Sequence, residues 1–258
     1  MVTELGLGAM DTPQSPMGAE TLSTALDLGI NFVDTARDYE GSEFLIGEVV
    51  RARGGKNFLI ATKTLSHDLD GSQRDVDKSL SMLGVDCVDL YQLHDISTVD
   101  AWERVMRPDG ALAGLQIAKY RGLIDHIGIS THNDQVVRKA ITCGEFDAVM
   151  LEYSAFFGET ASLIGLAHEL DVGVIAMRPL GGSGRTSVMR GRMAEGYAGP
   201  LTPASLLRYV LTNPGVSTAI PGARHPSRIS ENVATASSYE PMDAAARHVL
   251  EDEAKRLY

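Results

Sequence analysis

Short apolar runs recur along this chain at intervals of roughly 25–35 residues, and this repeat restricts the fold more than any other feature. Most of the runs are continuously apolar, which is typical of parallel strands that are covered on both faces. We therefore expect eight β-strands. They lie near residues 5–10, 31–36, 58–63, 87–94, 126–130, 148–154, 173–179 and 217–221.

Amphipathic segments lie between these runs and predict helices. The expected helices cover 18–29, 43–53, 72–84, 100–122, 133–143, 160–171, 202–213 and 226–237, with a last helix over 241–257. Eight alternations favour an α/β fold, a single-domain (β/α)8 TIM barrel over residues 1–258. The alternative is an open doubly wound sheet, but GLGAM (6–10) holds only a fragment of the glycine fingerprint of that fold. The glycines and arginines of 180–201 predict a mobile loop.

Composition and charge narrow the class of protein. A net charge of −11 argues against a partner that is a nucleic acid or an anionic membrane. No apolar run approaches the roughly 20 residues that span a bilayer, and the N-terminus has no signal-peptide pattern. The two cysteines, Cys87 and Cys143, do not indicate a disulfide scaffold. We expect a cytoplasmic protein.

Three successive apolar runs end on ionisable residues. They are NFVDTARDY (31–39), FLIATK (58–63) and CVDLYQLH (87–94), and they carry Asp34, Tyr39, Lys63 and His94. The carboxyl ends of barrel strands open on the face where such barrels do chemistry, so we expect these four side chains to converge there.

The four residue types together suit proton transfer to a carbonyl group. The Lys63 ammonium would lower the pKa of the Tyr39 phenol, and Asp34 would keep that ammonium charged. His94 would hold a carbonyl oxygen while Tyr39 protonates it, and a nicotinamide cofactor would supply the hydride that no side chain can donate. Taken singly, Asp34 could cap a helix, Tyr39 could pack, His94 could be structural, and Lys63 could form a Schiff base.

DTARDY with the following GSE, IATK, DLYQLH, HIGIS and AIPGARHPSRISEN together resemble the aldo-keto reductases, in the correct order and over nearly the whole chain. The resemblance implies that Asp34, Tyr39, Lys63 and His94 are the catalytic tetrad. Tyr39 would be the acid in carbonyl reduction and the base in alcohol oxidation. The family default is a monomer that binds NAD(P)H across the barrel mouth.

The resemblance also implies the cofactor residues. Ser130 matches the family's carboxamide-binding serine, whereas Met150 and Met177 stand where many members have a glutamine and an aromatic residue. Arg228, Glu231 and Asn232 match residues at the adenosine. Gly222 stands where many members have a lysine, and Arg224 would compensate, so NADP(H) is preferred over NAD(H). The full set is Ser130, Met150, Met177, Arg178, Pro179, Leu180, Gly181, Gly182, Gly222, Arg224, Arg228, Glu231 and Asn232.

The chain departs from the family in shape. Only four residues precede LGLGAM, so the usual N-terminal hairpin is expected to be missing, and the outer loops are expected to be short. An open pocket would follow, with Met10, Tyr39, Trp102, Phe156 and Phe157 as candidate walls. Packing of the fourth helix against the barrel is the preferred role for Trp102.

The leading functional hypothesis is an NADP(H)-dependent oxidoreductase that reduces a small-molecule aldehyde or ketone, with no metal site. One alternative is an NADPH-binding regulatory or redox-sensing subunit with little turnover. Another is a lyase that uses Lys63 as a Schiff-base nucleophile.

Overall fold

Eight parallel strands form one sheet whose order follows the sequence. The computed structural model describes residues 1–257, so the end of the expected domain 1–258 lies outside the described residues. The strands lie where the apolar runs predict them. They are β1 (Leu7–Gly8), β2 (Phe32–Asp34), β3 (Leu59–Thr64), β4 (Val88–Leu93), β5 (Ile124–Ser130), β6 (Ala148–Glu152), β7 (Gly173–Met177) and β8 (Thr218–Ala219).

Backbone bonds join the last strand to the first. Isolated parallel bridges link Leu5 with Ala219 and Gly8 with Gly222. The Gly6 amide donates to Ala219 O at 2.8 Å, and the Ala219 amide donates to Glu4 O at 2.8 Å. The sheet is therefore a barrel, as predicted, and not an open doubly wound sheet. No hairpin precedes β1 in the described residues.

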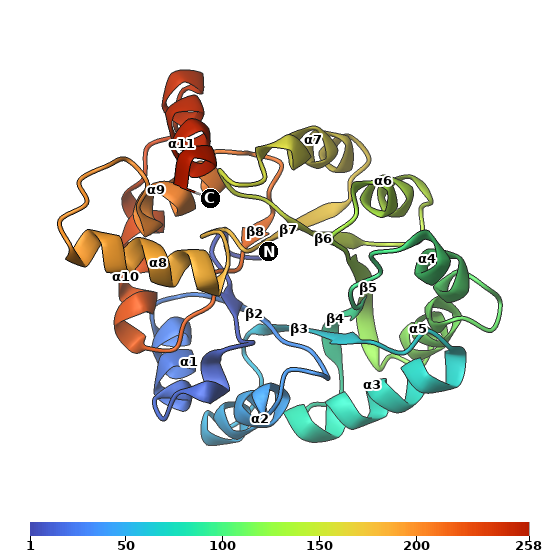
Figure 1. The fold of residues 1–258 in the computed structure, drawn as a ribbon. Coiled ribbons are helices and arrows are strands. Elements are labelled where there is room, and N and C mark those ends of the chain that lie inside the picture. The colour runs from blue at the N-terminus through green and yellow to red at the C-terminus, as the bar shows by residue number, and fades with distance from the viewer. Residues whose placement is uncertain (258) are drawn as a thin grey trace.

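Helices form a ring around the barrel (Figure 1). Most of them confirm the predicted segments to within a few residues. They are α1 (Gly18–Asp27), α2 (Ser42–Ala52), α3 (Leu69–Leu83), α4 (Val99–Val105), α5 (Ala111–Tyr120), α6 (Asp134–Thr142), α7 (Ala161–Glu169), α8 (Ser183–Ala194), α9 (Pro203–Leu211), α10 (Pro226–Ser238) and α11 (Ala244–Leu257), with short 3-10 turns at Thr12–Gln14 and Gly158–Thr160.

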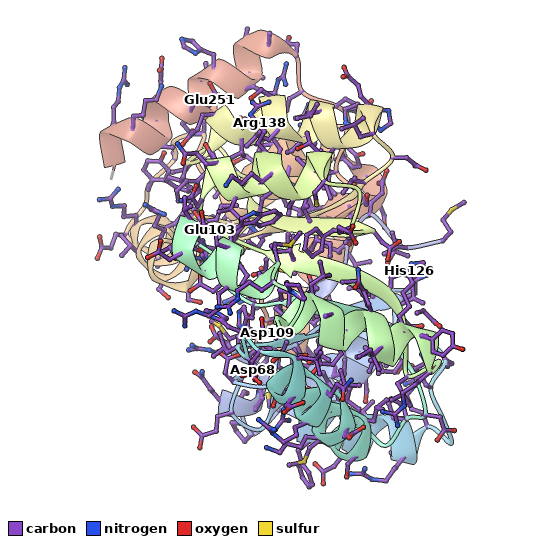
Figure 2. The ribbon with its side chains drawn as sticks, turned by 90° about the vertical axis from the view of Figure 1, so that its right-hand side faces the viewer. Asp68, Glu103, Asp109, His126, Arg138 and Glu251 are labelled. Carbon is purple, nitrogen blue, oxygen red and sulfur yellow. The ribbon has the colours of Figure 1, made fainter. Side chains whose placement is uncertain are left out.

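The predicted single helix over 100–122 is wrong, because the chain forms α4 and α5 with a break between them. Pro108 has no amide hydrogen to continue the helical ladder. Gly110 passes so close to α4 that a Cβ there would lie 2.4 Å from Val105 O. The break returns the chain to the start of α3, where the Leu69 amide donates to Asp109 O at 2.9 Å. Figure 2 shows Asp68 and Asp109 close together at this place.

The irregular stretch predicted over 180–201 is also wrong in part, because α8 occupies its centre. Gly181 and Gly182 both have positive φ angles, 83° and 89°, and they form the turn that leads into the helix. Met189 packs into the core with 2% of its surface exposed. This apolar contact fixes a helix whose glycine content alone would disfavour it.

The barrel interior explains why polar side chains gather at the strand ends. Phe32, Ala61, Leu90, Met150, Ile175 and Ile220 form an apolar layer inside the barrel. Side chains two positions further along a strand point to the same face. The next inward positions on β2, β3 and β4 are Asp34, Lys63 and Gln92, and they stand above the apolar layer.

Two helical glycines allow a matched test of how closely α2 packs against α3. A Cβ on Gly47 of α2 would lie 2.2 Å from Met82 O, whereas nothing lies within 4 Å of a Cβ built on Gly165 of α7. We expect Gly47→Ala to lower the free energy of unfolding by about 1–3 kcal/mol. Gly165→Ala should raise it by about 0.5–1 kcal/mol through its better helix propensity. Urea unfolding of both variants measures the difference, and equal effects would contradict the close crossing of α2 and α3.

Candidate active site

A buried ion pair lies at the centre of the site. The Lys63 ammonium donates to Asp34 Oδ2 at 2.7 Å and to the backbone oxygen of Thr35 at 2.7 Å. Gln92 Nε2 donates to the other carboxylate oxygen, Oδ1, at 3.3 Å. Lys63 is 1% exposed and Asp34 is 3% exposed. Strands β2, β3 and β4 thus fix both charges through bonds that water does not screen.

Burial and the ion pair with Lys63 shift the pKa of Asp34 in opposite directions. Loss of water raises the pKa of the Asp34 carboxyl above its usual range, and the charge and hydrogen bond of Lys63 oppose this shift. Burial is the larger cause, so the carboxylate depends on Lys63 to remain ionised.

Tyr39 and His94 stand above this pair. The Tyr39 hydroxyl lies 3.5 Å from His94 Nε2. The two rings meet edge to face with centroids 5.4 Å apart. Lys63 Nζ lies 4.8 Å from the centre of the Tyr39 ring. The structure therefore brings the four predicted residues together.

The expected effect of Lys63 on Tyr39 is wrong. The pKa of the Tyr39 phenol is raised, not lowered, because burial disfavours the phenolate and the carboxylates of Asp34 and Asp38 repel it. Asp34 neutralises the ammonium that was expected to stabilise the phenolate. Tyr39 consequently holds its proton at neutral pH, which suits a proton donor.

His94 has a second partner that the sequence reading missed. Its Nδ1 lies 2.8 Å from Asp38 Oδ1. Burial and the Lys63 charge lower the pKa of His94, and Asp38 opposes them. Asp38 directly precedes Tyr39, so the signal was an acidic residue beside the proposed acid.

A cavity of about 360 Å³ opens above the tetrad. Asp34, Tyr39 and His94 line it, while Lys63 lies beneath its floor. Most of the predicted cofactor residues also line it, namely Ser130, Met150, Met177, Arg178, Pro179, Leu180, Gly182, Gly222, Arg224, Arg228 and Asn232. Gly181 and Glu231 do not line it, although both lie beside residues that do.

Charged residues gather at the end of the cavity formed by α8 and α10. Glu231 binds Arg190 at 3.0 Å and Arg228 at 2.6 Å. Arg224 pairs with Asp11 at 3.1 Å, and Ser183 donates to the same Asp11 oxygen at 2.8 Å. Ser183, which was expected with Gly181 and Gly182 at the pyrophosphate, lines the cavity. Asp11 and Arg190 also line it and were not predicted; Arg190 belongs to the segment that was expected to be a loop.

The predicted pocket walls are only partly correct. Met10 and Tyr39 line the cavity. Trp102 packs against Phe146 with ring centroids 6.1 Å apart, which agrees with its preferred role. Phe156 and Phe157 do not line this cavity; the Arg185 guanidinium lies 5.0 Å and 5.2 Å from their ring centres.

Residues 1–257 contain no group of three or more His, Cys, Asp or Glu side chains that could hold a metal ion. None of their helices is both long and apolar enough to cross a membrane.

Comparison with known proteins places this chain in a family. The model of the Aldo/keto reductase family matches residues 4–196. The oxidoreductase YqkF of Bacillus subtilis is 25% identical over 99% of this chain and 92% of its own length. The aldo-keto reductase yakc [NADP(+)] of Schizosaccharomyces pombe is 30% identical over 76% of this chain but only 59% of its own.

A solved structure gives the same fold. The holo form of an aldo-keto reductase from Bacillus halodurans superposes with a TM-score of 0.79, at 23% identity, over 97% of this chain and 92% of the other.

The buried ion pair can be tested through stability. Lys63→Met leaves the Asp34 carboxylate buried without its cation, and we expect the free energy of unfolding to fall by about 3–5 kcal/mol. The double variant Lys63→Met/Asp34→Leu should regain most of this loss, because no buried charge remains. Urea unfolding at neutral pH measures both.

The loss of stability in Lys63→Met should also depend on pH. Burial raises the pKa of Asp34 in the folded state, and removal of Lys63 raises it further, so the folded protein binds this proton more tightly than the unfolded chain does. The stability that protonation of Asp34 contributes is present at low pH and is lost as the pH rises through the pKa of Asp34 in the folded protein. The deficit of Lys63→Met should therefore shrink on acidification; a deficit that grows would contradict a raised pKa.

Proposed function

The chain belongs to the aldo/keto reductase family, whose oxidoreductases act on carbonyl and alcohol groups with a nicotinamide cofactor, and we propose that it uses NADP(H) to reduce a small-molecule aldehyde or ketone. One observation carries this proposal. The protonated phenol of Tyr39 faces the cavity directly above the buried Lys63–Asp34 pair, with His94 beside its oxygen.

The residues present fit a nicotinamide cofactor. The lining changes along the cavity from the sulfur side chains Met150 and Met177 at the tetrad to Arg224 and Arg228 at the far end. An apolar floor suits a flat ring, and guanidinium groups suit phosphates. Ser130, Met150 and Met177 would hold the nicotinamide, and when bound this group supplies the hydride.

Tyr39 would transfer its proton to the carbonyl oxygen of the substrate. Its raised pKa keeps the phenol protonated until negative charge develops on that oxygen. The buried pair of Lys63 and Asp34 would position the Tyr39 ring, whose centre lies 4.8 Å from Lys63 Nζ. Below its own pKa, His94 would donate Nε2–H to the same carbonyl oxygen and hold it near the phenol.

Three arginines support a preference for NADP(H) over NAD(H). Arg190, Arg224 and Arg228 line one end of the cavity from α8, from the residues after β8 and from α10. Within residues 1–257, two carboxylates pair with them, those of Asp11 and Glu231. The remaining positive charge suits a 2′-phosphate, which an arginine fork can bind through two hydrogen bonds.

Tyr39→Phe tests the acid role. The change keeps the ring and removes the hydroxyl, so we expect kcat for reduction of an aldehyde panel to fall by about 10²–10⁴-fold. NADPH affinity, measured by fluorescence titration, should change less than about threefold because the phenol lies at the tetrad end of the cavity. Unchanged turnover in this variant would remove Tyr39 from the mechanism. Failure of the unmodified protein to oxidise NADPH with any carbonyl compound would favour the redox-sensing alternative.

Arg228→Gln and Arg224→Gln test the cofactor preference. Each removes a cation from the proposed 2′-phosphate end, and we expect the Kd for NADPH to rise about 10-fold while the Kd for NADH changes little. Arg138→Gln is the matched control, since Figure 2 shows Arg138 on the outer surface. Equal loss of NADPH and NADH affinity would show that the arginines bind a part common to both cofactors.

A further inference from the structure

Two consecutive residues contact the two ring nitrogens of one histidine. Asp38 reaches His94 Nδ1 at 2.8 Å, and Tyr39 reaches His94 Nε2 at 3.5 Å. Asp38 and Tyr39 follow β2, whereas His94 follows β4. The ring is therefore held between adjacent side chains from one turn, and its orientation depends on that turn.

The turn that carries Asp38 and Tyr39 is itself firmly fixed. The Arg37 amide donates to Lys63 O at 3.1 Å, and the Tyr39 amide donates to Ala36 O at 3.2 Å. The Arg37 guanidinium pairs with Glu43, whose side chain is 4% exposed. Asp38 thus approaches His94 from a backbone that is anchored on both β3 and α2.

The chemistry of the two contacts determines where the histidine proton lies. A carboxylate can only accept hydrogen bonds, so the ring nitrogen that faces Asp38 must carry a hydrogen. In neutral imidazole only one nitrogen is protonated, and the other then carries a lone pair. Neutral His94 consequently presents a bare Nε2 to Tyr39 and to the cavity, and it accepts a hydrogen bond there.

We propose that Asp38 is a positioning residue that locks neutral His94 in the Nδ1–H tautomer, so that His94 can donate to a substrate carbonyl only as the imidazolium. Uncharged, His94 accepts from the Tyr39 hydroxyl and draws the phenol proton away from the substrate. Charged, it donates Nε2–H to the carbonyl oxygen and leaves the phenol proton free to transfer. Asp38 thereby makes reduction depend on the charge of His94. This inference rests on the proposed carbonyl reduction.

Several groups bear on the charge of His94. Asp38 contacts Nδ1 and Tyr39 contacts Nε2. The charges of Lys63 and of Asp95, the next residue in the chain, also act on the ring. Burial and Lys63 favour the neutral form, whereas Asp38 and Asp95 favour the charged form. Of the two carboxylates, only Asp38 is hydrogen bonded to the ring, since Asp95 Oδ1 accepts from Ser97.

This difference makes Asp95→Asn a control for Asp38→Ala. Both changes remove one negative charge near His94, but only the change at Asp38 removes the carboxylate from Nδ1. Asparagine also tolerates the left-handed backbone of Asp95, where φ is 54°. A purely electrostatic role predicts similar effects for the two variants, whereas a tautomer lock predicts an effect at Asp38 alone.

The first measurement is ¹⁵N NMR of the histidine rings in the full-length protein at about pH 8, where imidazole is neutral. His94 should carry its proton on Nδ1 in the unmodified protein and in Asp95→Asn. In Asp38→Ala, which leaves no acceptor at Nδ1, the proton should move to Nε2. A proton on Nε2 in the unmodified protein, or on Nδ1 in Asp38→Ala, would overturn the inference. This result needs no turnover, so it is independent of the proposed function.

The second measurement is the pH dependence of kcat/KM for aldehyde reduction with NADPH. The pKa of His94 lies below its usual value, so the imidazolium is lost as pH rises through the acid side of neutrality. Between about pH 5.5 and pH 8 we expect at least a 10-fold fall in the unmodified protein and in Asp95→Asn. Asp38→Ala should fall by less than about twofold, because its neutral His94 can donate through Nε2–H. The same fall in all three proteins would overturn the lock.

Discussion

The buried pair of Lys63 and Asp34 is the interaction on which the rest of the site depends. Each charge would be costly alone in the barrel interior, and together with Gln92 and Thr35 O they satisfy one another. Strands β2, β3 and β4 each contribute to this cluster, so their register and the site geometry are a single constraint. Tyr39 and His94 are placed relative to this fixed charge and not relative to solvent.

The fold could be predicted because its determinants are local and repeated. Each buried strand is visible in the sequence as an apolar run. Alternate residues along the strand then point to the same face of the sheet. Asp34 and Lys63 could be expected to meet because both lie at the ends of apolar runs, and the structure shows that each stands two positions beyond an inward apolar residue. The family resemblance extended this reading along the cavity, where most of the expected residues lie.

Features that arise from contacts distant in sequence could not be predicted in the same way. The break before Ala111 depends on a close approach of Gly110 to α4, and α8 depends on the burial of Met189. The pKa of Tyr39 was misjudged for a related reason. The sequence shows that Lys63 is near, but only the structure shows that Asp34 cancels its charge and that burial exceeds both effects. The role of Asp38 was not predicted because its partner, His94, is distant in sequence and follows another strand.

The barrel seam has a consequence for how this chain is made. The seam joins β1 to β8, and a side-chain bond beside it, from Thr12 Oγ1 to Ala223 O, connects residues 211 positions apart. No part of the seam can form until β8 has been synthesised and has left the ribosome. The earlier strands, including β2, β3 and β4, can therefore form only a sheet with open edges until β8 emerges. Unpaired strand edges can bind strands of other chains, so the nascent chain is prone to aggregate until β8 closes the barrel.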